Sequence, residues 1–251
     1  MATRITATRR DDGILVLQIS CPERRNILDE ASYATLIEAL DSAEADDGVK
    51  VLILTGTENC FTAGNDLDNY RALAQADSVS AVSFLRRLHA FRKPAIAAAE
   101  GIAMGLGVSM LLHCDFAYAG HSIRLQLPFS RFALSPIGAT TLLLPRLAGP
   151  KAASEMLLLS NTFSAREARE IGLVTDTAPD GRALEQAFDC AARLLARPYE
   201  ALLATKALMR DAQAEAIEAA LDREEQALLE RCRSPEAQSA IDAFFASRRH
   251  P

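Results

Sequence analysis

The amino-acid sequence predicts an α/β fold in which strands and helices alternate. Short apolar runs such as Val49 to Leu54 are followed by longer segments whose apolar residues recur at helical spacing, and glycine, proline or aspartate separates them. Apolar residues make up 49% of the 251 residues and charged residues 24%, the balance of an ordinary globular protein. A chain of this length can bury one large core. The alternation of strands and helices suggests stacked β-β-α turns.

Local signals mark where the predicted elements begin and end. Arg4 to Thr8 and Ile14 to Ile19 are expected to form a hairpin whose tight turn contains Gly13. Asp29 is a good N-cap for the helix that follows. The later elements are expected, in order, as the strand Val49 to Leu54, a helix around Val82 to Phe91 that Pro94 ends, the strand Ala95 to Ala99, the helix Gly105 to Cys114, the strand Phe116 to Tyr118, a helix with a Ser164–Glu167 capping box closed by Gly172, and the strand Leu173 to Thr175.

The character of the chain changes after Pro198. Residues 199–247 contain no glycine and a single proline, Pro235, and they are expected to form long amphipathic helices. We therefore divide the chain into a spiral core at 1–197 and a helical region at 198–251 that makes subunit contacts. The apolar stripe of that region comprises Leu202, Leu203, Leu208, Ile217, Leu221, Leu228 and Leu229.

Composition also limits the partners and the location. The net charge of −6 gives no general attraction to nucleic acid or anionic membranes, so neither is an expected partner. Apolar runs are much shorter than the roughly 20 residues of a membrane helix, and we expect a cytoplasmic protein. The five cysteines are odd in number and widely separated, which favours reduced, buried thiols over disulfides. The histidines and cysteines do not form a metal-binding motif.

Two small-residue segments are candidates for binding a ligand through the backbone. Phe61 to Asn65 follows a buried strand, and its small side chains leave main-chain N–H groups accessible. Gly101 to Gly107 precedes a short apolar helix whose first N–H groups favour negative charge. Donors from two such loops can form an oxyanion hole, although each segment alone is more often explained by packing.

The order and spacing of these segments resemble the crotonase superfamily, also called the enoyl-CoA hydratase/isomerase family. The similarity covers nearly the whole chain and is closest to the peroxisomal-type Δ3,Δ2-enoyl-CoA isomerases and their bacterial relatives. The segments that carry it are 25–28, 54–56, 61–67, 93–101, 105–107, 114–115, 127–136, 144–158 and 168–174.

The resemblance implies a spiral of β-β-α turns, a C-terminal helical region that builds a homotrimer or a dimer of trimers, and a bound acyl-CoA thioester. Coenzyme A would be part of the substrate, without a separate cofactor. By motif position, the two oxyanion-hole N–H groups fall on Asn65 and Leu106. The positions implied for CoA binding are Arg24, Arg25, Ala63, Gly64, Asp66 and Leu67, together with Phe244, Phe245 and Arg248 of a C-terminal tail.

The sequence departs from the family at the acid–base positions. Where hydratases carry two glutamates, this chain has Ser109 and Phe129. Where the isomerases carry a carboxylate in a Ser-Pro-Glu-Gly segment, it has Ile137. Ser109, Phe129, Leu134 and Ile137 therefore predict an acyl pocket that is apolar and dry, which disfavours hydration.

Several functions remain open at this stage. The main hypothesis is an isomerase or hydratase homologue that uses an unmatched acid–base group. Thioester hydrolysis or decarboxylation through the same oxyanion hole, and acyl-CoA binding without turnover, are the alternatives. A remote alternative is a ClpP-like serine peptidase with Ser109 as nucleophile and His121 as base. Asp66 is interpreted as a turn cap, Asp115 as a structural connector, and the four histidines as structural or solvated.

Overall fold

The computed structural model describes the backbone of residues 2–249 and the side chains of residues 2–247, and it contains two β-sheets. The larger sheet has six strands in the order β1 (Arg4–Arg9), β2 (Ile14–Ser20), β3 (Val51–Thr55), β4 (Ala95–Ala99), β6 (Phe116–Gly120) and β9 (Asp176–Ala178). The smaller sheet has the order β5 (Ile102–Met104), β7 (Arg124–Gln126) and β8 (Phe163–Ser164). β1 and β2 form the expected antiparallel hairpin, and the other neighbours in the larger sheet are parallel.

Consecutive strands are divided between the two sheets, which produces the predicted β-β-α turns. β4 lies in the larger sheet, β5 in the smaller one, and α4 (Leu106–His113) follows. β6 and β7 repeat this division before α5 (Thr140–Leu158), whose axis breaks at Gly149, where φ is 77°. Each of these turns thus adds one strand to each sheet.

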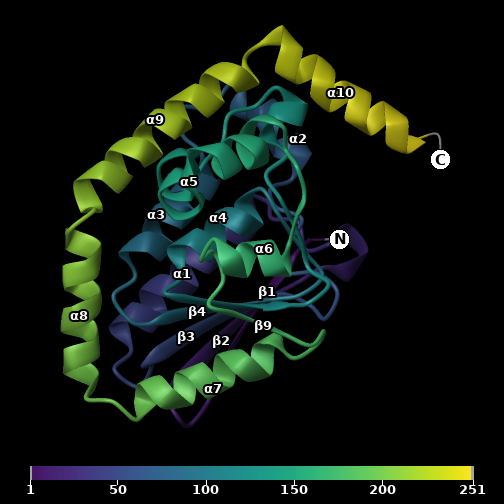
Figure 1. Cartoon of the computed structure of the whole chain (residues 1–251). Coiled ribbons are helices and arrows are strands. Elements are labelled where there is room, and N and C mark those ends of the chain that lie inside the picture. Colours follow the sequence, from purple (N-terminus) through teal and green to yellow (C-terminus); the bar gives the residue numbers. More distant parts are fainter. Residues whose placement is uncertain (1, 250–251) are drawn as a thin grey trace.

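Helices cover both faces of the larger sheet. Figure 1 shows α7 (Ala183–Leu195) on one face, with α1 (Glu30–Ala45), α3 (Ser80–Ala90) and α4 on the other. The buried side chains of β3 alternate between these faces: Leu52 and Leu54 join the main core, whereas Val51 and Ile53 pack with α7. Because both faces are buried, every position of β3 is buried and the strand is apolar from Val51 to Leu54, as parallel strands commonly are.

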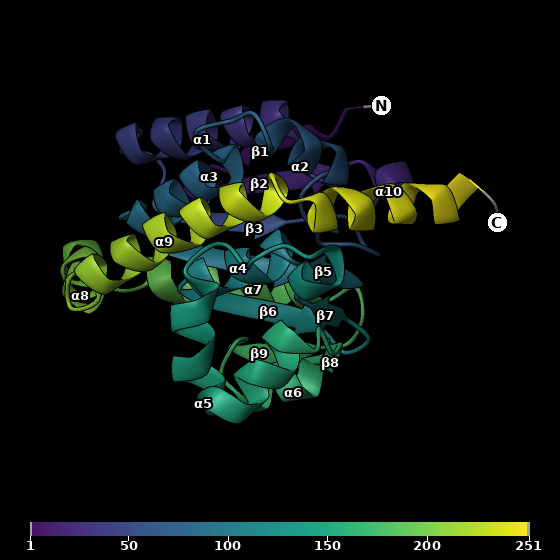
Figure 2. The same ribbon diagram turned by 90° about the horizontal axis from the view of Figure 1, so that it is seen from above.

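Helices complete the fold at the sheet edges and along the C-terminal part. α2 (Leu67–Leu73) and α6 (Ala165–Glu170) are short, and η1 (Pro22–Arg24) and η2 (Phe129–Phe132) are 3₁₀ turns. Residues 199–249 form α8 (Tyr199–Asp211), α9 (Ala214–Cys232) and α10 (Pro235–Arg249), in agreement with the expected helical character. Figure 2 shows α9 crossing over α3 with α10 continuing beyond the core, and α9 also contacts α2 and α5.

Several predicted boundaries are confirmed by their hydrogen bonds, and one is wrong. The Asp29 side chain accepts from Ser32 N, and Ser164 and Glu167 form the reciprocal capping box of α6. The strand expected at Leu173 to Thr175 instead begins at Asp176, because the Leu173 and Val174 amides still bond to the Ala168 carbonyl at the end of α6. Within the described residues, the helices fall short of the length and apolar character that membrane crossing requires.

Candidate functional site

The first small-residue segment lies between two other parts of the backbone. On one side, Leu28 N donates to Gly64 O at 2.8 Å, and Asp66 N donates to Leu28 O at 2.8 Å. On the other side, Thr62 N donates to Ile102 O at 3.1 Å, and Met104 N donates to Thr62 O at 3.0 Å. The segment therefore extends the small sheet at the edge where β5 leads into α4.

Two glycines let the two loops touch. Gly64 has φ of 90° and Gly105 has φ of 50°. Residues other than glycine rarely adopt backbone conformations with positive φ. A Cβ atom added to Gly64 would lie 2.7 Å from Met104 O and 3.5 Å from Leu106 N. Glycine at position 64 is therefore needed for the close approach that brings the Leu106 amide beside the residue preceding Asn65.

The Asn65 and Leu106 amides differ from their neighbours. Ala63 N donates to Arg25 O at 2.9 Å, Gly64 N to Thr62 Oγ1 at 3.0 Å, and Gly105 N to Gln126 O at 2.8 Å. In the part of the chain that the structure describes, the N–H groups of Asn65 and Leu106 have no protein acceptor. Leu106 is the first residue of α4, so its amide also lies at the positive end of a helix. Both donors remain available to a ligand oxygen.

The Asn65 side chain fixes the first loop. Its Oδ1 accepts from Tyr33 OH at 2.9 Å and from Asn69 Nδ2 at 3.1 Å. Burial raises the pKa of Tyr33, so the phenol remains a protonated donor. The next residue, Asp66, caps α2 through Asp68 N and pairs with Arg24 at 2.6 Å. The interpretation of Asp66 as a cap is thus confirmed, and its pairing with Arg24 had no signal in the local sequence.

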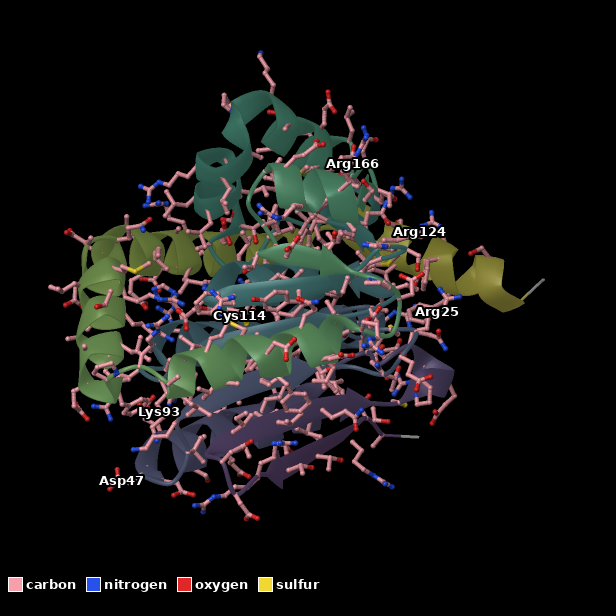
Figure 3. The ribbon with its side chains drawn as sticks, turned by 60° about the horizontal axis from the view of Figure 1, so that its bottom comes forward. Arg25, Asp47, Lys93, Cys114, Arg124 and Arg166 are labelled. Carbon is pink, nitrogen blue, oxygen red and sulfur yellow. The ribbon has the colours of Figure 1, made fainter. Side chains whose placement is uncertain are left out.

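The candidate CoA-binding residues lie around this loop and on the C-terminal helix. Arg25 is exposed and lines a surface pocket of about 590 Å³ together with Arg124 and the 57–60 turn, and Figure 3 shows both arginines at the same edge of the molecule. Ala63 and Gly64 belong to the loop itself, and Leu67 is the first residue of α2.

The C-terminal aromatic residues pack within their own chain in this structure. Phe244 lies edge-on to Phe132 of η2, with ring centroids 5.4 Å apart. The Arg71 guanidinium lies 4.7 Å from the centre of the Phe245 ring. The side chain of Arg248 lies outside the described residues. Through these contacts, Phe244 and Phe245 of α10 pack against η2 and α2.

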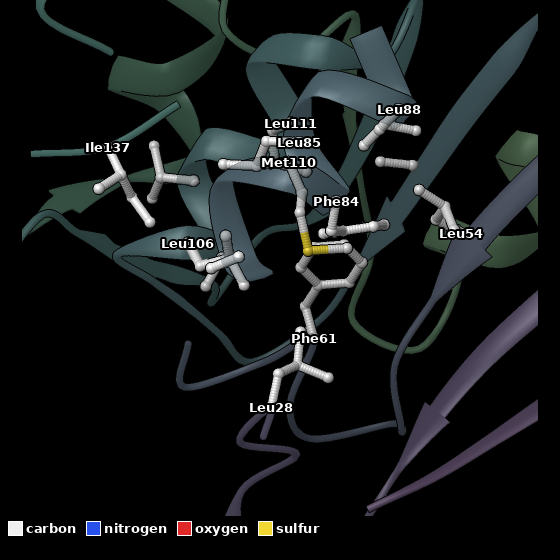
Figure 4. Packing of buried hydrophobic residues seen from close by; sticks show 14 of the residues in the cluster. Leu28, Leu54, Phe61, Phe84, Leu85, Leu88, Leu106, Met110, Leu111 and Ile137 are labelled. Carbon is white, nitrogen blue, oxygen red and sulfur yellow. The ribbon is translucent and has the colours of Figure 1, made fainter. Parts of the chain in front are cut away.

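The expected acyl-pocket side chains are all buried. Ser109, Phe129, Leu134 and Ile137 belong to the interior, and the three apolar ones join the same core cluster as Leu106. Figure 4 shows Ile137 and Leu106 in this cluster with Met110 and Leu111 of α4. The side chains at positions 129, 134 and 137 cannot exchange a proton, so the surroundings of the two amides are apolar on this side.

Ser109 contributes to the structure of the turn that contains Ile137. Its Oγ lies 3.4 Å from Gly105 O, 3.1 Å from Ile137 O and 3.2 Å from Thr140 Oγ1. These contacts do not include an imidazole of the described residues, and His121 is exposed elsewhere on the surface. The geometry does not support the serine peptidase alternative.

Two histidines lie close to the same turn but remain neutral. His113 Nε2 bonds to Gly138 O at 2.9 Å, and its Nδ1 lies 3.3 Å from His89 Nδ1. Burial, helped by the nearby positive charge of Arg210, lowers the pKa of His113 to about 3 and that of His89 to about 4. Asp115 accepts from Ala95 N, Lys206 and Arg210, which accounts for both its carboxylate oxygens. The two histidines and Asp115 therefore have structural roles, as expected from the sequence.

Glu224 on α9 is a residue near this turn that the sequence interpretation missed. It is 5% exposed, and its Oε1 accepts from Thr141 N at 2.7 Å and from Thr141 Oγ1 at 2.6 Å. Its Oε2 is buried and, among the described residues, lacks a hydrogen-bond partner. The available signal was a charge on the apolar stripe of the helix, between Leu221 and Leu228. The described side chains do not gather three potential ligands for a metal ion.

Comparisons with known proteins agree with the fold and the motifs. The family model described as Enoyl-CoA hydratase/isomerase matches residues 9–251. The 2,3-dehydroadipyl-CoA hydratase of Escherichia coli is 32% identical over 95% of this chain and 94% of its own length. The 1,2-epoxyphenylacetyl-CoA isomerase of the same organism is 31% identical over 95% of this chain and 94% of its own. The structure of Pseudomonas aeruginosa OdaA superposes with a TM-score of 0.92 at 36% identity, covering 96% of this chain and 98% of that one. The chain belongs to the enoyl-CoA hydratase/isomerase family.

Proposed function

We propose that the protein binds an acyl-CoA thioester and shifts a proton along its acyl chain, as an enoyl-CoA isomerase does. The observation that carries this proposal is the pair of unpartnered amides at Asn65 and Leu106, on two loops in contact. Family membership supports acyl-CoA as the ligand class.

The two amides would hold the thioester oxygen while negative charge develops on it. Removal of a proton from the carbon beside the thioester places an electron pair on that oxygen, and fixed N–H donors stabilise the resulting enolate more than the ground state. Loss of one such donor typically costs about 2.7–4 kcal/mol of transition-state stabilisation. The main chain alone can therefore make this proton removable.

The apolar surroundings favour isomerisation over hydration. Phe129 and Ile137 occupy the positions where relatives would hold a water or move a proton, and both are buried. A dry site disfavours addition of water to a double bond and suits a hydrocarbon chain. Hydration is therefore the less favoured reaction of the family for this chain.

A second candidate function is acyl-CoA binding without turnover. It is favoured by the absence of a titratable side chain at positions 109, 129 and 137. General acid–base assistance commonly contributes about 10²–10⁴-fold, so a site without it would bind and polarise the thioester but react slowly.

One experiment separates these functions. The protein is titrated with a 3-enoyl-CoA by calorimetry, and the same mixture is analysed by mass spectrometry and ultraviolet absorption. Formation of the conjugated 2-enoyl-CoA supports the isomerase, and unchanged ligand supports the binder. Free CoA would indicate thioester hydrolysis, and absence of binding would refute the proposal. In a parallel incubation with a carboxylated acyl-CoA, loss of carbon dioxide would indicate decarboxylation.

We also propose a homotrimer or a dimer of trimers in the cytoplasm. Exposed apolar side chains on α8 support subunit contacts, because Leu208 is 73% and Met209 is 69% exposed in the single chain. In such an assembly Arg24, Arg25 and the 63–67 loop would meet the nucleotide and pantetheine parts of CoA, with Phe244, Phe245 and Arg248 close to a neighbouring site. Light scattering would measure the oligomeric state.

A further inference from the structure

The inner face of α9 lies along the turn that contains Ile137. Glu224 and Arg231 are seven residues apart on this helix, so they share a face. Glu224 bonds to Thr141, and Arg231 Nε donates to Ala133 O at 2.8 Å. α9 therefore contacts the 133–141 segment at both ends, with Ile137 at its centre.

The two carboxylate oxygens of Glu224 have different surroundings. Oε1 caps the start of α5, where the N-cap residue Ala139 has no side chain that could accept a hydrogen bond. This contact accounts for one oxygen only. Oε2 is equally buried and without a partner, and the one other buried side-chain atom of the described residues in this condition is Ser135 Oγ. Both unpartnered atoms belong to residues that flank the Ile137 turn in sequence or in space.

Hydrogen bonds connect this region with the Leu106 amide. Thr140, which precedes the residue bound by Glu224, has its Oγ1 3.2 Å from Ser109 Oγ. Ser109 Oγ in turn lies 3.4 Å from Gly105 O, whose peptide group carries the Leu106 N–H. Glu224 is thus part of the polar structure that surrounds the candidate site, and it supplies a carboxylate there, whereas the other titratable member, His113, has both ring nitrogens engaged by Gly138 and His89.

The proton affinity of Glu224 suits proton transfer. Burial raises the pKa of its carboxyl above the usual value, while the hydrogen bonds from Thr141 and the neighbouring backbone N–H groups of Thr140 and Ala139 oppose this shift. A carboxylate is most effective as a base when its pKa is close to the working pH. A buried carboxyl whose pKa is shifted by desolvation is a candidate functional group on this ground.

We propose that Glu224 Oε2 is the proton-transfer group of this site, replacing the carboxylate that relatives carry at the position of Ile137. The inference rests on the proposed acyl-CoA function. The carboxylate takes a proton from C2 of a 3-enoyl thioester, and the electron pair moves through the C1–C2 bond onto the thioester oxygen. The carboxyl then returns the proton to C4 as the double bond moves to C2–C3, so the protein and the redox state are unchanged.

Exchange of acyl hydrogens with solvent tests this step directly. The full-length protein is incubated with butyryl-CoA in D₂O, and deuterium at C2 is followed by mass spectrometry. Glu224→Gln retains an oxygen that can cap α5 but removes the base. We expect its exchange rate to fall by at least about 100-fold, with butyryl-CoA affinity within about twofold of the wild type.

Glu100→Gln is the matched control. Glu100 is also buried, and its Oε1 accepts from Ala183 N at 2.9 Å at the start of α7, on the opposite face of the large sheet. Its substitution should alter stability without changing exchange. Thr141→Val provides a second test that keeps the base: loss of a donor to Oε1 raises the pKa of Glu224 and shifts the acidic limb of the exchange profile to higher pH.

The outcomes separate the inference from the function. Equal exchange in wild type and Glu224→Gln, an unshifted profile in Thr141→Val, or binding of butyryl-CoA without exchange would each overturn the role of Glu224 and leave acyl-CoA binding intact. If the folded wild-type protein does not bind butyryl-CoA, the proposed function itself fails.

Discussion

Ser109 Oγ lies 3.1 Å from the carbonyl oxygen of Ile137, so a helix that starts at one candidate amide also holds the turn where the family resemblance implies a carboxylate. Thr140 Oγ1 bonds to the same carbonyl, and His113 bonds to the carbonyl of Gly138. The turn is therefore fixed by three buried side chains although its central residue is chemically inert. A fixed turn of this kind can position a new side chain without reorganisation.

Ile137→Glu should create or raise isomerase activity. The Ile137 side chain is fully buried beside the core residues shown in Figure 4, so a carboxyl there would be desolvated and would have a raised pKa, which suits a base at pH 8. We expect a gain of about 10²–10⁴-fold in 3-enoyl-CoA isomerisation in the Glu224→Gln background. Ile137→Gln, similar in shape but unable to transfer a proton, is the control. Absence of a gain in a folded variant would count against placing Ile137 at the family's carboxylate position.

Gly64→Ala should damage the site more than the fold. The added Cβ would meet Met104 O at 2.7 Å and would strain a backbone with φ of 90°. Displacement of the Asn65 amide should lower kcat by about 10²–10³-fold, as loss of an oxyanion donor does. The measurement is isomerase turnover alongside thermal unfolding.

Gly181→Ala separates backbone strain from damage to the site. Gly181 has φ of 81° and open space around its Cβ position. Its substitution should cost roughly 1–2 kcal/mol of stability and leave turnover unchanged. Similar activity losses in the two variants would show that the loop contact at Gly64 has no special role.

Hydration of crotonyl-CoA should be very slow. The two positions where the resemblance implies the hydratase glutamates hold Ser109, whose hydroxyl contacts Ile137 O and Thr140 Oγ1, and the apolar Phe129. Loss of acid–base groups commonly costs about 10²–10⁴-fold. The loss of the conjugated thioester absorbance, measured beside a hydratase of the family, provides the test. Comparable rates would refute the dry-pocket interpretation.

Stability should decrease with acidification through the buried histidine pair. Burial lowers the pKa of His113 to about 3 and that of His89 to about 4, both below the unfolded value of about 6.5. Between these values the unfolded state binds more protons, so the free energy of unfolding falls as the pH drops from 6.5 towards 4.

His113→Gln should flatten this dependence, although it also removes the bond to Gly138. The melting temperature is measured at pH 8, 6 and 5 for the wild type, for His113→Gln and for the exposed control His121→Gln. An identical pH slope in the wild type and His113→Gln would mean that other groups cause the acid sensitivity.

Local signals in the sequence predicted much of the fold because they act over a few residues. Asp29 and the Ser164–Glu167 pair marked helix starts correctly, since a cap needs only its own first turn. The strands β5, β7 and β8 were missed because two or three residues are too short to show an alternating pattern. These short strands are held by pairing with distant segments.

The site was partly predictable for a similar reason. The small residues at 63–64 and the glycines at 105 and 107 indicated exposed backbone, but the anchoring of Asn65 by Tyr33 spans 32 positions and has no local signature. Glu224 reaches Thr141 across 83 positions and was missed, because helical periodicity shows it only as one charged residue within an apolar stripe. Contacts of this range follow from the packing of whole helices.

The two amides at Asn65 and Leu106 belong to the main chain, and this has a consequence for how the protein can diversify. Substitution of a side chain does not remove a peptide N–H donor, provided that the close contact of Gly64 with Met104 O and the hydrogen bond from Tyr33 to Asn65 persist. If these amides bind a thioester oxygen as proposed, the side chains around it can vary, and the reaction with them, while binding of the substrate is retained. Ser109, Phe129 and Ile137, at positions where the resemblance implies carboxylates, are the kind of change that main-chain binding of this sort would tolerate.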